Sequence, residues 1–213
     1  MADYELILVA EPSPKVRRIT LNRPEKRNAL NNRLRGEIFQ ALEAHDRDPD
    51  VRVSIVRGAG PCFSAGYDLS ANNAVEQPYY SAGGTGQWAR HVVEGWFGIW
   101  DLAKPVIAQV HGYCLAGGSE LATACDLVYV AEDAQIGYPP VRLMSPPDMQ
   151  FHPWLVGLRQ AMESMLTGDA MSGAEAAAKG FANRAFPLAD LDGAVLAVAE
   201  RVAKIPSELQ QIN

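Results

Sequence analysis

Glu120 has the surroundings in this sequence that best suit proton transfer. It follows Gly117-Gly118, where a glycine turn leads into a short apolar helix over residues 119–124. The first N–H groups of a helix lack an intrahelical acceptor, and the helix dipole adds positive potential there. Glycine has no Cβ, so a ligand can approach these donors closely. A backbone N–H beside a carboxylate suits the stabilisation of an oxyanion while a proton moves.

A second glycine turn offers a second donor. Ala65-Gly66 follows a predicted strand and exposes the backbone at Tyr67, whose N–H could face that of Gly117 across a shared pocket. Each turn also has a purely structural explanation. A glutamate in a first helical turn commonly matches the helix dipole, and Asp68 could cap an ordinary strand exit. The presence of both turns favours the chemical interpretation.

The composition excludes several classes of protein. The chain has 213 residues, 48% of them hydrophobic and 21% charged, which is typical of a soluble globular domain. A net charge of −6 argues against binding to nucleic acid or to an anionic membrane. No apolar run is long enough for a membrane span, and the acidic start is unlike a signal peptide. The three cysteines lack metal-ligand spacing, so we expect no metal site, buried reduced thiols and a cytoplasmic location; Cys114 alone has a glycine turn beside it that could make it reactive.

The elements that position these residues alternate between strands and helices, which predicts an α/β fold. Apolar residues four apart, as at Leu34, Ile38 and Leu42, mark a core-facing helix stripe. We expect strands over residues 4–10, 16–22, 51–58, 106–110, from 127 onward and over 181–187. We expect helices over residues 30–42, 88–102, 119–124, from 149 or 153 to 166, and over 172–180 and 190–204.

Three polar features lie between these elements. Asn28 is predicted to cap the first helix, and Lys26 and Arg27 before it are solvated charges unless a phosphate-bearing ligand binds there. Residues 72–87 form a polar loop that could act as a lid. Asp148 stands at a helix start, where capping explains it without a chemical role.

Three ordered motifs resemble the crotonase (enoyl-CoA hydratase/isomerase) superfamily, and the match covers essentially the whole chain. They are Leu21–Leu30, Phe63–Leu69 and Pro105–Leu121, followed by the later matches Leu166–Gly168 and Ser172–Ala178. The resemblance implies a ββα spiral core over residues 1–187 with an acyl-CoA pocket. Residues 188–213 would begin a C-terminal helical trimerisation and capping region, incomplete in this chain. It also implies a homotrimer or a dimer of trimers.

The resemblance also assigns roles to residues. The N–H groups of Tyr67 and Gly117 would hold the oxygen of a thioester, and Glu120 would move protons. Coenzyme A enters as part of the substrate, and no further cofactor is implied. The implied substrate-binding residues are Glu25, Lys26, Arg27, Ala29, Ala65, Gly66, Tyr67, Asp68, Leu69, Tyr113, Gly117 and Pro140.

One position departs from the family pattern. Hydratases of this family carry two glutamates; Glu120 matches the first, but the second falls on Pro140, which cannot transfer a proton. The nearest remaining acid is Asp148, whose place resembles that of a catalytic aspartate in other branches. Three functions therefore stay open. The first is an enoyl-CoA hydratase or isomerase that uses Glu120 with help from Asp148. The second is a hydrolase of CoA thioesters or β-diketones based on Asp148, with His91 or His152 assisting. The third is a non-catalytic acyl-CoA-binding subunit.

Overall fold

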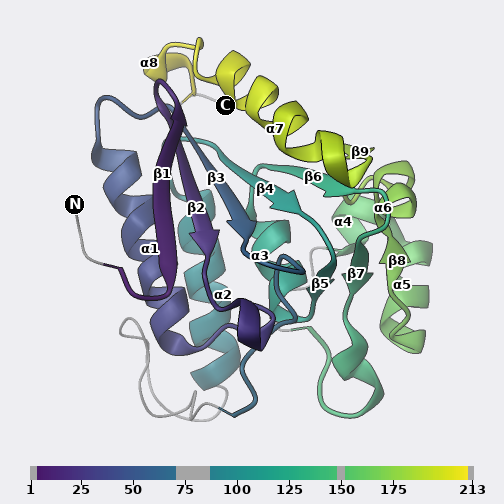
Figure 1. The fold of residues 1–213 in the computed structure, drawn as a ribbon. Helices are drawn as coiled ribbons and strands as arrows, with labels where there is room; N and C mark the ends of the chain where they lie inside the picture. Colours follow the sequence, from purple (N-terminus) through teal and green to yellow (C-terminus); the bar gives the residue numbers. More distant parts are fainter. Residues whose placement is uncertain (1–3, 71–86, 148–151, 211–213) are drawn as a thin grey trace.

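The computed structural model describes residues 4–70, 87–147 and 152–210, which form two sheets with helices packed around them (Figure 1). The strands of the larger sheet are β1 (Ile7–Ser13), β2 (Val16–Leu21), β3 (Val53–Gly58), β4 (Val106–Val110), β6 (Leu127–Ala131) and β9 (Arg184–Phe186). They lie in the order β1-β2-β3-β4-β6-β9. Only β1 and β2 pair antiparallel; the other neighbours are parallel. This is the α/β architecture that the alternation predicts.

The central strands are buried because helices cover both faces of the sheet. Every residue of β4 is buried, in keeping with its run of apolar residues. The longer helices are α1 (Asn32–Arg47), α2 (Gln87–Trp100), α3 (Gly117–Ala124), α5 (Leu158–Thr167), α6 (Gly173–Lys179) and α7 (Leu188–Val202). The helix α7 runs along one side of the sheet, whereas α1, α2 and α3 lie on the other (Figure 1). None of the helices in the described ranges could span a membrane.

The apolar stripes of two helices face the core, including the one predicted for the first helix. Leu34, Ile38 and Leu42 of α1 are buried, as are Leu191 and Val195 of α7. Burying each such side chain contributes roughly 1.5–3 kcal/mol to folding. These two helices are therefore held by their apolar faces, as their spacing predicts.

The smaller sheet was not predicted. Its strands are β5 (Tyr113–Leu115), β7 (Gln135–Gly137) and β8 (Met171–Ser172), in the order β5-β7-β8. Strands this short carry too few residues to show a hydrophobic period. The remaining elements are the 3₁₀ helices η1 (Pro24–Lys26) and η2 (Pro139–Arg142) and the short helices α4 (His152–Val156) and α8 (Ser207–Gln210).

Most predicted boundaries shift by a few residues, and two of the differences have a clear physical cause. The first strand begins at Ile7 rather than at residue 4, because the N–H groups of Glu5 and Leu6 bind the Glu37 carboxylate instead of a neighbouring strand. The helix expected to end at residue 166 is divided into α4 and α5 at Gly157, whose φ of +78° is incompatible with a continuous helix.

The first helix is capped by a different asparagine from the one predicted. Asn31 is the N-cap, and its side chain accepts a 2.8 Å hydrogen bond from the N–H of Leu34. Asn28 is instead buried, and its side-chain amide donates to the carbonyls of Ala59 and Cys62 at 2.9 and 2.8 Å. The prediction for Asn28 was wrong because the chain makes a left-handed turn there, with φ of +53°, before the helix begins.

Candidate active site

The two glycine turns predicted to cooperate lie against each other. Ser64 pairs with β5, donating its N–H to Tyr113 and accepting from Leu115, each at 3.0 Å. This pairing brings Gly66 beside the start of α3. A Cβ placed on Gly66 would lie 2.8 Å from the Cβ of Ala116 and 3.4 Å from the nitrogen of Gly117. A larger residue at position 66 would therefore separate the two turns.

The backbone at Tyr67 is oriented by a parallel bridge to Leu30. Leu30 donates to the carbonyl of Gly66 at 2.8 Å, and its own carbonyl accepts from Asp68 at 3.0 Å. In a parallel pair of this kind, the residue between those two partners directs its own N–H to the opposite edge. The Tyr67 N–H therefore points away from Leu30, to the edge that faces residues 113–117.

The Gly117 N–H is the first donor of α3. The N–H groups of Ser119 and Glu120 both bind the carbonyl of Ala116, at 2.9 and 3.1 Å. Within the described ranges, the Gly117 N–H has no hydrogen-bond acceptor. The preceding Ala116 has φ of +49°, a strained conformation of the kind that clusters at functional sites. The helix start thus presents an available donor at the place predicted from the sequence.

The Glu120 carboxylate lies inside the protein, with 0% of the residue exposed. Its Oε2 accepts a hydrogen bond from the Tyr67 hydroxyl at 2.5 Å, and the Trp96 indole Nε1 donates to that hydroxyl at 3.1 Å. Burial, followed by the negative charge of Glu120, raises the pKa of Tyr67 well above its ordinary value. The phenol is therefore protonated and acts as a donor.

Sequence reasoning missed the side chains around this carboxylate. It assigned only the backbone of Tyr67 to the site and gave no chemical role to Trp96, which lies in the helix predicted over residues 88–102. Arg35 of α1 is fully buried, and its guanidinium carbon lies 6.0 Å from the centre of the Tyr67 ring and 5.8 Å from that of Trp96. The available signal was an arginine next to Leu34 in the apolar stripe of α1.

A family sequence profile described as enoyl-CoA hydratase/isomerase matches residues 11–213. The chain belongs to this family. It is 35% identical over 209 residues to the mitochondrial enoyl-CoA hydratase of Pongo abelii, an alignment covering 95% of this chain and 69% of that protein. Crystal structures give the same result. An enoyl-CoA hydratase/isomerase from Xanthobacter autotrophicus Py2 superposes with a TM-score of 0.88 at 37% identity, covering 98% of this chain and 77% of the other. An enoyl-CoA hydratase from Mycobacterium smegmatis gives 0.87 at 33% identity, covering 99% and 75%.

These matches confirm the predicted crotonase-type fold and an enzyme of the enoyl-CoA hydratase/isomerase family. Several predicted residues are absent from the described part of the chain. Asp148 and the loop over residues 72–87, apart from Gln87, which begins α2, lie outside the described residues, as do the side chains of His91 and His152. Pro140 lies in η2, where its carbonyl accepts from the N–H groups of Met144 and Leu143 at 2.8 and 3.1 Å.

Most residues that the family resemblance assigns to coenzyme A lie in two segments, one in and after η1 and one in the turn that follows β3. Glu25, Lys26 and Arg27 are exposed in and after η1, and the Arg27 guanidinium lies 5.6 Å from the centre of the Tyr113 ring. Leu69 is also exposed. These side chains leave charged and apolar surface open to a ligand, and Ala65 ties the two segments together by donating to the carbonyl of Arg27 at 3.0 Å.

Asp68 has a structural task in the described structure. Its carboxylate is buried, forms a 2.9 Å ion pair with Arg23 and accepts from the N–H and hydroxyl of Ser70 at 3.0 and 2.6 Å. Burial opposes the charge, but the hydrogen bonds from Ser70 and Arg23 outweigh it and hold the pKa of Asp68 below its ordinary value. The carboxylate thus joins the loop before η1 to the turn that carries Tyr67.

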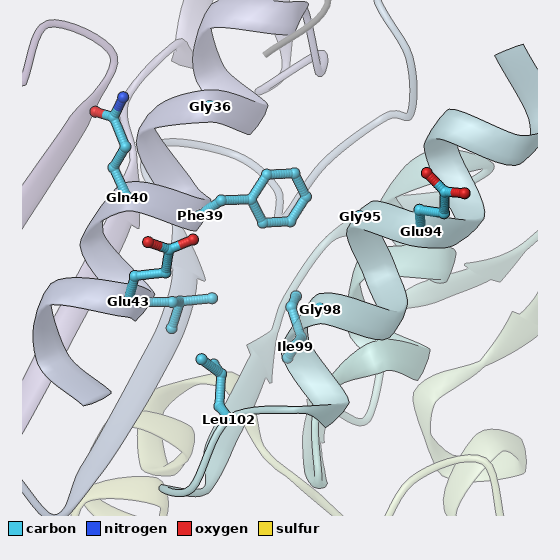
Figure 2. A pocket seen from close by; sticks show the side chains of 10 residues that line it. Gly36, Phe39, Gln40, Glu43, Glu94, Gly95, Gly98, Ile99 and Leu102 are labelled. Atoms are coloured by element: carbon cyan, nitrogen blue, oxygen red, sulfur yellow. The ribbon is translucent and has the colours of Figure 1, made fainter. Parts of the chain in front are cut away.

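Three other features of the described residues concern thiols, metal ligands and a cavity. The three thiols are free and buried, and burial raises the pKa of Cys114, so it is a poor nucleophile. The side chains of the described residues form no group of three or more metal ligands. A cavity of about 260 Å³ lies between α1 and α2 (Figure 2), with Phe39, Leu42, Ile99 and Leu102 among its lining residues. Phe39 also packs edge-on against Trp96, with ring centres 5.6 Å apart. The cavity therefore lies beside the group formed by Glu120, Tyr67 and Trp96, and none of these three residues lines it.

Proposed function

We propose that the protein moves protons on acyl-CoA thioesters, with Glu120 as the acid–base group. The N–H groups of Tyr67 and Gly117 would bind the thioester oxygen. The observation that carries this proposal is the contact between Gly66 and the start of α3, with Glu120 in the first turn of that helix. An oxygen bound there would lie within reach of both donors and of the acid.

The chemistry follows from where charge develops. When Glu120 takes a proton from the α-carbon of a 3-enoyl thioester, the electron pair of that C–H bond forms a double bond to the carbonyl carbon, and negative charge moves onto the thioester oxygen. Fixed N–H donors stabilise this charge, and removing one such donor costs about 3–4 kcal/mol in comparable sites. Return of the proton to a different carbon of the enolate gives an isomer, so one acid–base group suffices. Hydration needs in addition a group to activate water, and Pro140 occupies the place where the family resemblance puts that group.

Double-bond isomerisation of an enoyl-CoA is therefore the reaction that the described residues support best. If Asp148 activated a water molecule, the enzyme would hydrate the double bond or hydrolyse the thioester instead. Lys26 and Arg27 are proposed to contact the nucleotide phosphates of coenzyme A, because they are exposed cations on the loop that Ala65 joins to the oxygen site. Assembly as a trimer or a dimer of trimers remains part of the proposal.

A panel of 2-enoyl-, 3-enoyl-, dienoyl- and 3-ketoacyl-CoA thioesters tests the function. Each product is read by mass, by absorbance and by release of free thiol. We expect a change in absorbance without a change in mass. A mass gain of one water would instead assign hydration, and free thiol would assign hydrolysis. Asp148→Asn separates these cases, because it should leave isomerisation active and abolish either alternative. Tight binding of every thioester without any conversion would support the non-catalytic subunit and refute the proposal.

A further inference from the structure

The phenol of Tyr67 and the carboxylate of Glu120 form a hydrogen bond that the sequence did not predict. The donor and acceptor are 53 residues apart in sequence and lie 2.5 Å from each other. In the proposed site Tyr67 would contribute twice, with its backbone N–H as an oxygen donor and with its hydroxyl on the acid. A residue of this type would couple the oxygen-binding turn to the proton-transfer group.

The direction of the hydrogen bond is fixed by Trp96. An indole N–H can only donate, so the oxygen of Tyr67 accepts from Trp96 at 3.1 Å. The single proton of the phenol is then directed to Glu120. The two hydrogen bonds form a chain that runs from α2 through the loop to α3, in which Trp96 donates to Tyr67 and Tyr67 donates to Oε2 of Glu120.

The ring that carries this hydroxyl is held on two sides. A Cβ at position 117 would lie 2.7 Å from two ring atoms, so the ring packs directly on the glycine backbone. The buried Arg35 guanidinium lies 6.0 Å from the ring centre, within the range of a cation–π contact. The phenol therefore cannot turn away from Glu120 without displacing packed groups.

Fixing the carboxylate matters because a glutamate side chain ends in a torsion with a broad energy minimum. A general base must hold its oxygen in line with the proton that it removes, and small errors of placement lower the rate. We propose that Tyr67 is a positioning residue that holds the Glu120 carboxylate in one orientation for proton transfer. The inference rests on the function proposed above, and it concerns the side chain of Tyr67 rather than its N–H.

Tyr67→Phe tests this role, because it removes the hydroxyl and keeps the ring against Gly117. Loss of a hydrogen bond to a charged group should lower kcat by about tenfold to a hundredfold. KM should change much less, because the backbone donors remain. Tyr129→Phe is the matched control. That tyrosine is buried in β6 against Phe186, with ring centres 6.3 Å apart. Removing its hydroxyl should leave kcat unchanged.

The double variant Tyr67→Phe/Glu120→Gln separates positioning from packing. If the hydroxyl acts through Glu120, adding Tyr67→Phe to Glu120→Gln should cause no further loss of kcat. Losses that multiply would show that the hydroxyl acts independently of the acid and would overturn the proposal. Full activity of Tyr67→Phe would overturn it as well.

A measurement without turnover keeps the inference separate from the proposed function. Tyrosines labelled with ¹³C at Cζ report phenol ionisation by NMR, and the Tyr67 signal is the one missing from Tyr67→Phe. It should remain neutral at a pH where exposed tyrosines ionise, and it should ionise at lower pH in Glu120→Gln. If the wild-type enzyme converts no thioester, the proposed function is wrong, but this titration still tests the contact between Tyr67 and Glu120. A Tyr67 signal that Glu120→Gln does not shift contradicts the inference.

Discussion

The ring of Tyr67 lies directly on the α-carbon of Gly117. No side chain fits between them, since a Cβ at residue 117 would meet the ring at 2.7 Å. Glycine at this position therefore has two roles, which are to expose the first N–H of α3 and to accommodate the aromatic ring. Gly118, which was predicted to open the backbone to a ligand, instead packs on Ser64, where a Cβ would lie 2.5 Å from the carbonyl oxygen.

Replacing Gly117 by alanine should reduce activity more than stability. The new methyl group must displace the Tyr67 ring, which breaks its contact with Glu120. We expect kcat/KM to fall by roughly a hundredfold, as for loss of an oxyanion donor. The control is Gly193→Ala, because a Cβ on that residue of α7 meets nothing within 4 Å. It should leave activity unchanged and raise the free energy of unfolding by roughly 0.4–1 kcal/mol. Equal activity in the two variants would refute the role given to Gly117.

Glu120→Gln should separate activity from folding. We expect kcat to fall by at least about a hundredfold, because the amide cannot exchange a proton with substrate. The side chain is fully buried, and an amide is cheaper to bury than a charge, so the melting temperature should stay the same or rise. Steady-state kinetics and thermal unfolding of the same sample check both parts. A large loss of stability would show that the carboxylate serves the fold.

His45 should make the protein less stable in mild acid. Burial, with a smaller effect of the Arg17 charge, lowers the pKa of His45 from 6.5 to about 4. The unfolded chain then binds a proton that the folded protein does not, so stability is full above pH 6.5 and falls as the pH drops to about 4. The loss approaches about 3 kcal/mol.

Urea unfolding at several pH values in this window tests the effect. His45→Gln retains a polar group opposite Ser54, whose hydroxyl lies 3.0 Å from the His45 ring, but it cannot titrate. Its stability should decline less with falling pH than that of the wild type. Parallel pH curves for the two proteins would exclude His45 as the source.

Asp192 should anchor α7 to the sheet. Its carboxylate lies 2.8 Å from Arg57 and 3.1 Å from Arg18, and it accepts from Gln109 at 3.1 Å. These partners share one face of the sheet, because Arg57 stands in register with both Thr20 and Gln109. Asp192→Ala leaves two cations without this carboxylate, but the site is half exposed, so we expect a loss of only about 1–2 kcal/mol. Urea unfolding measures this loss of stability. The control is Glu43→Ala, which breaks the exposed i, i+4 ion pair with Arg47 and should lower the free energy of unfolding by less than about 0.5 kcal/mol.

The long elements could be predicted from the sequence because their apolar spacing reflects burial in the final fold. Leu34, Ile38 and Leu42 repeat every four residues and lie in the core, and the apolar run of β4 is buried between parallel neighbours. The short strands β5 and β7 could not be predicted in this way. Their pairing depends on Ser64 and on residues far along the chain, and three residues show no period.

The positions of Gly117 and Glu120 in a helix start also followed from local sequence. The contact between Tyr67 and Glu120 did not, since it requires the path of the chain from Gly66 to the start of α3. Arg35 shows the same limit, because a charged residue beside an apolar stripe is usually solvated. The aromatic rings of Tyr67 and Trp96, which lie within cation–π range of its guanidinium, help to explain its burial.

Residues 64–68 are joined to Leu30 on one edge and to β5 on the other, so three distant stretches of chain meet at the oxygen site. Contacts of such long sequence separation form slowly during folding. During refolding, helical signal should therefore return before enzymatic competence, and regained turnover would report that the whole tertiary arrangement has been completed.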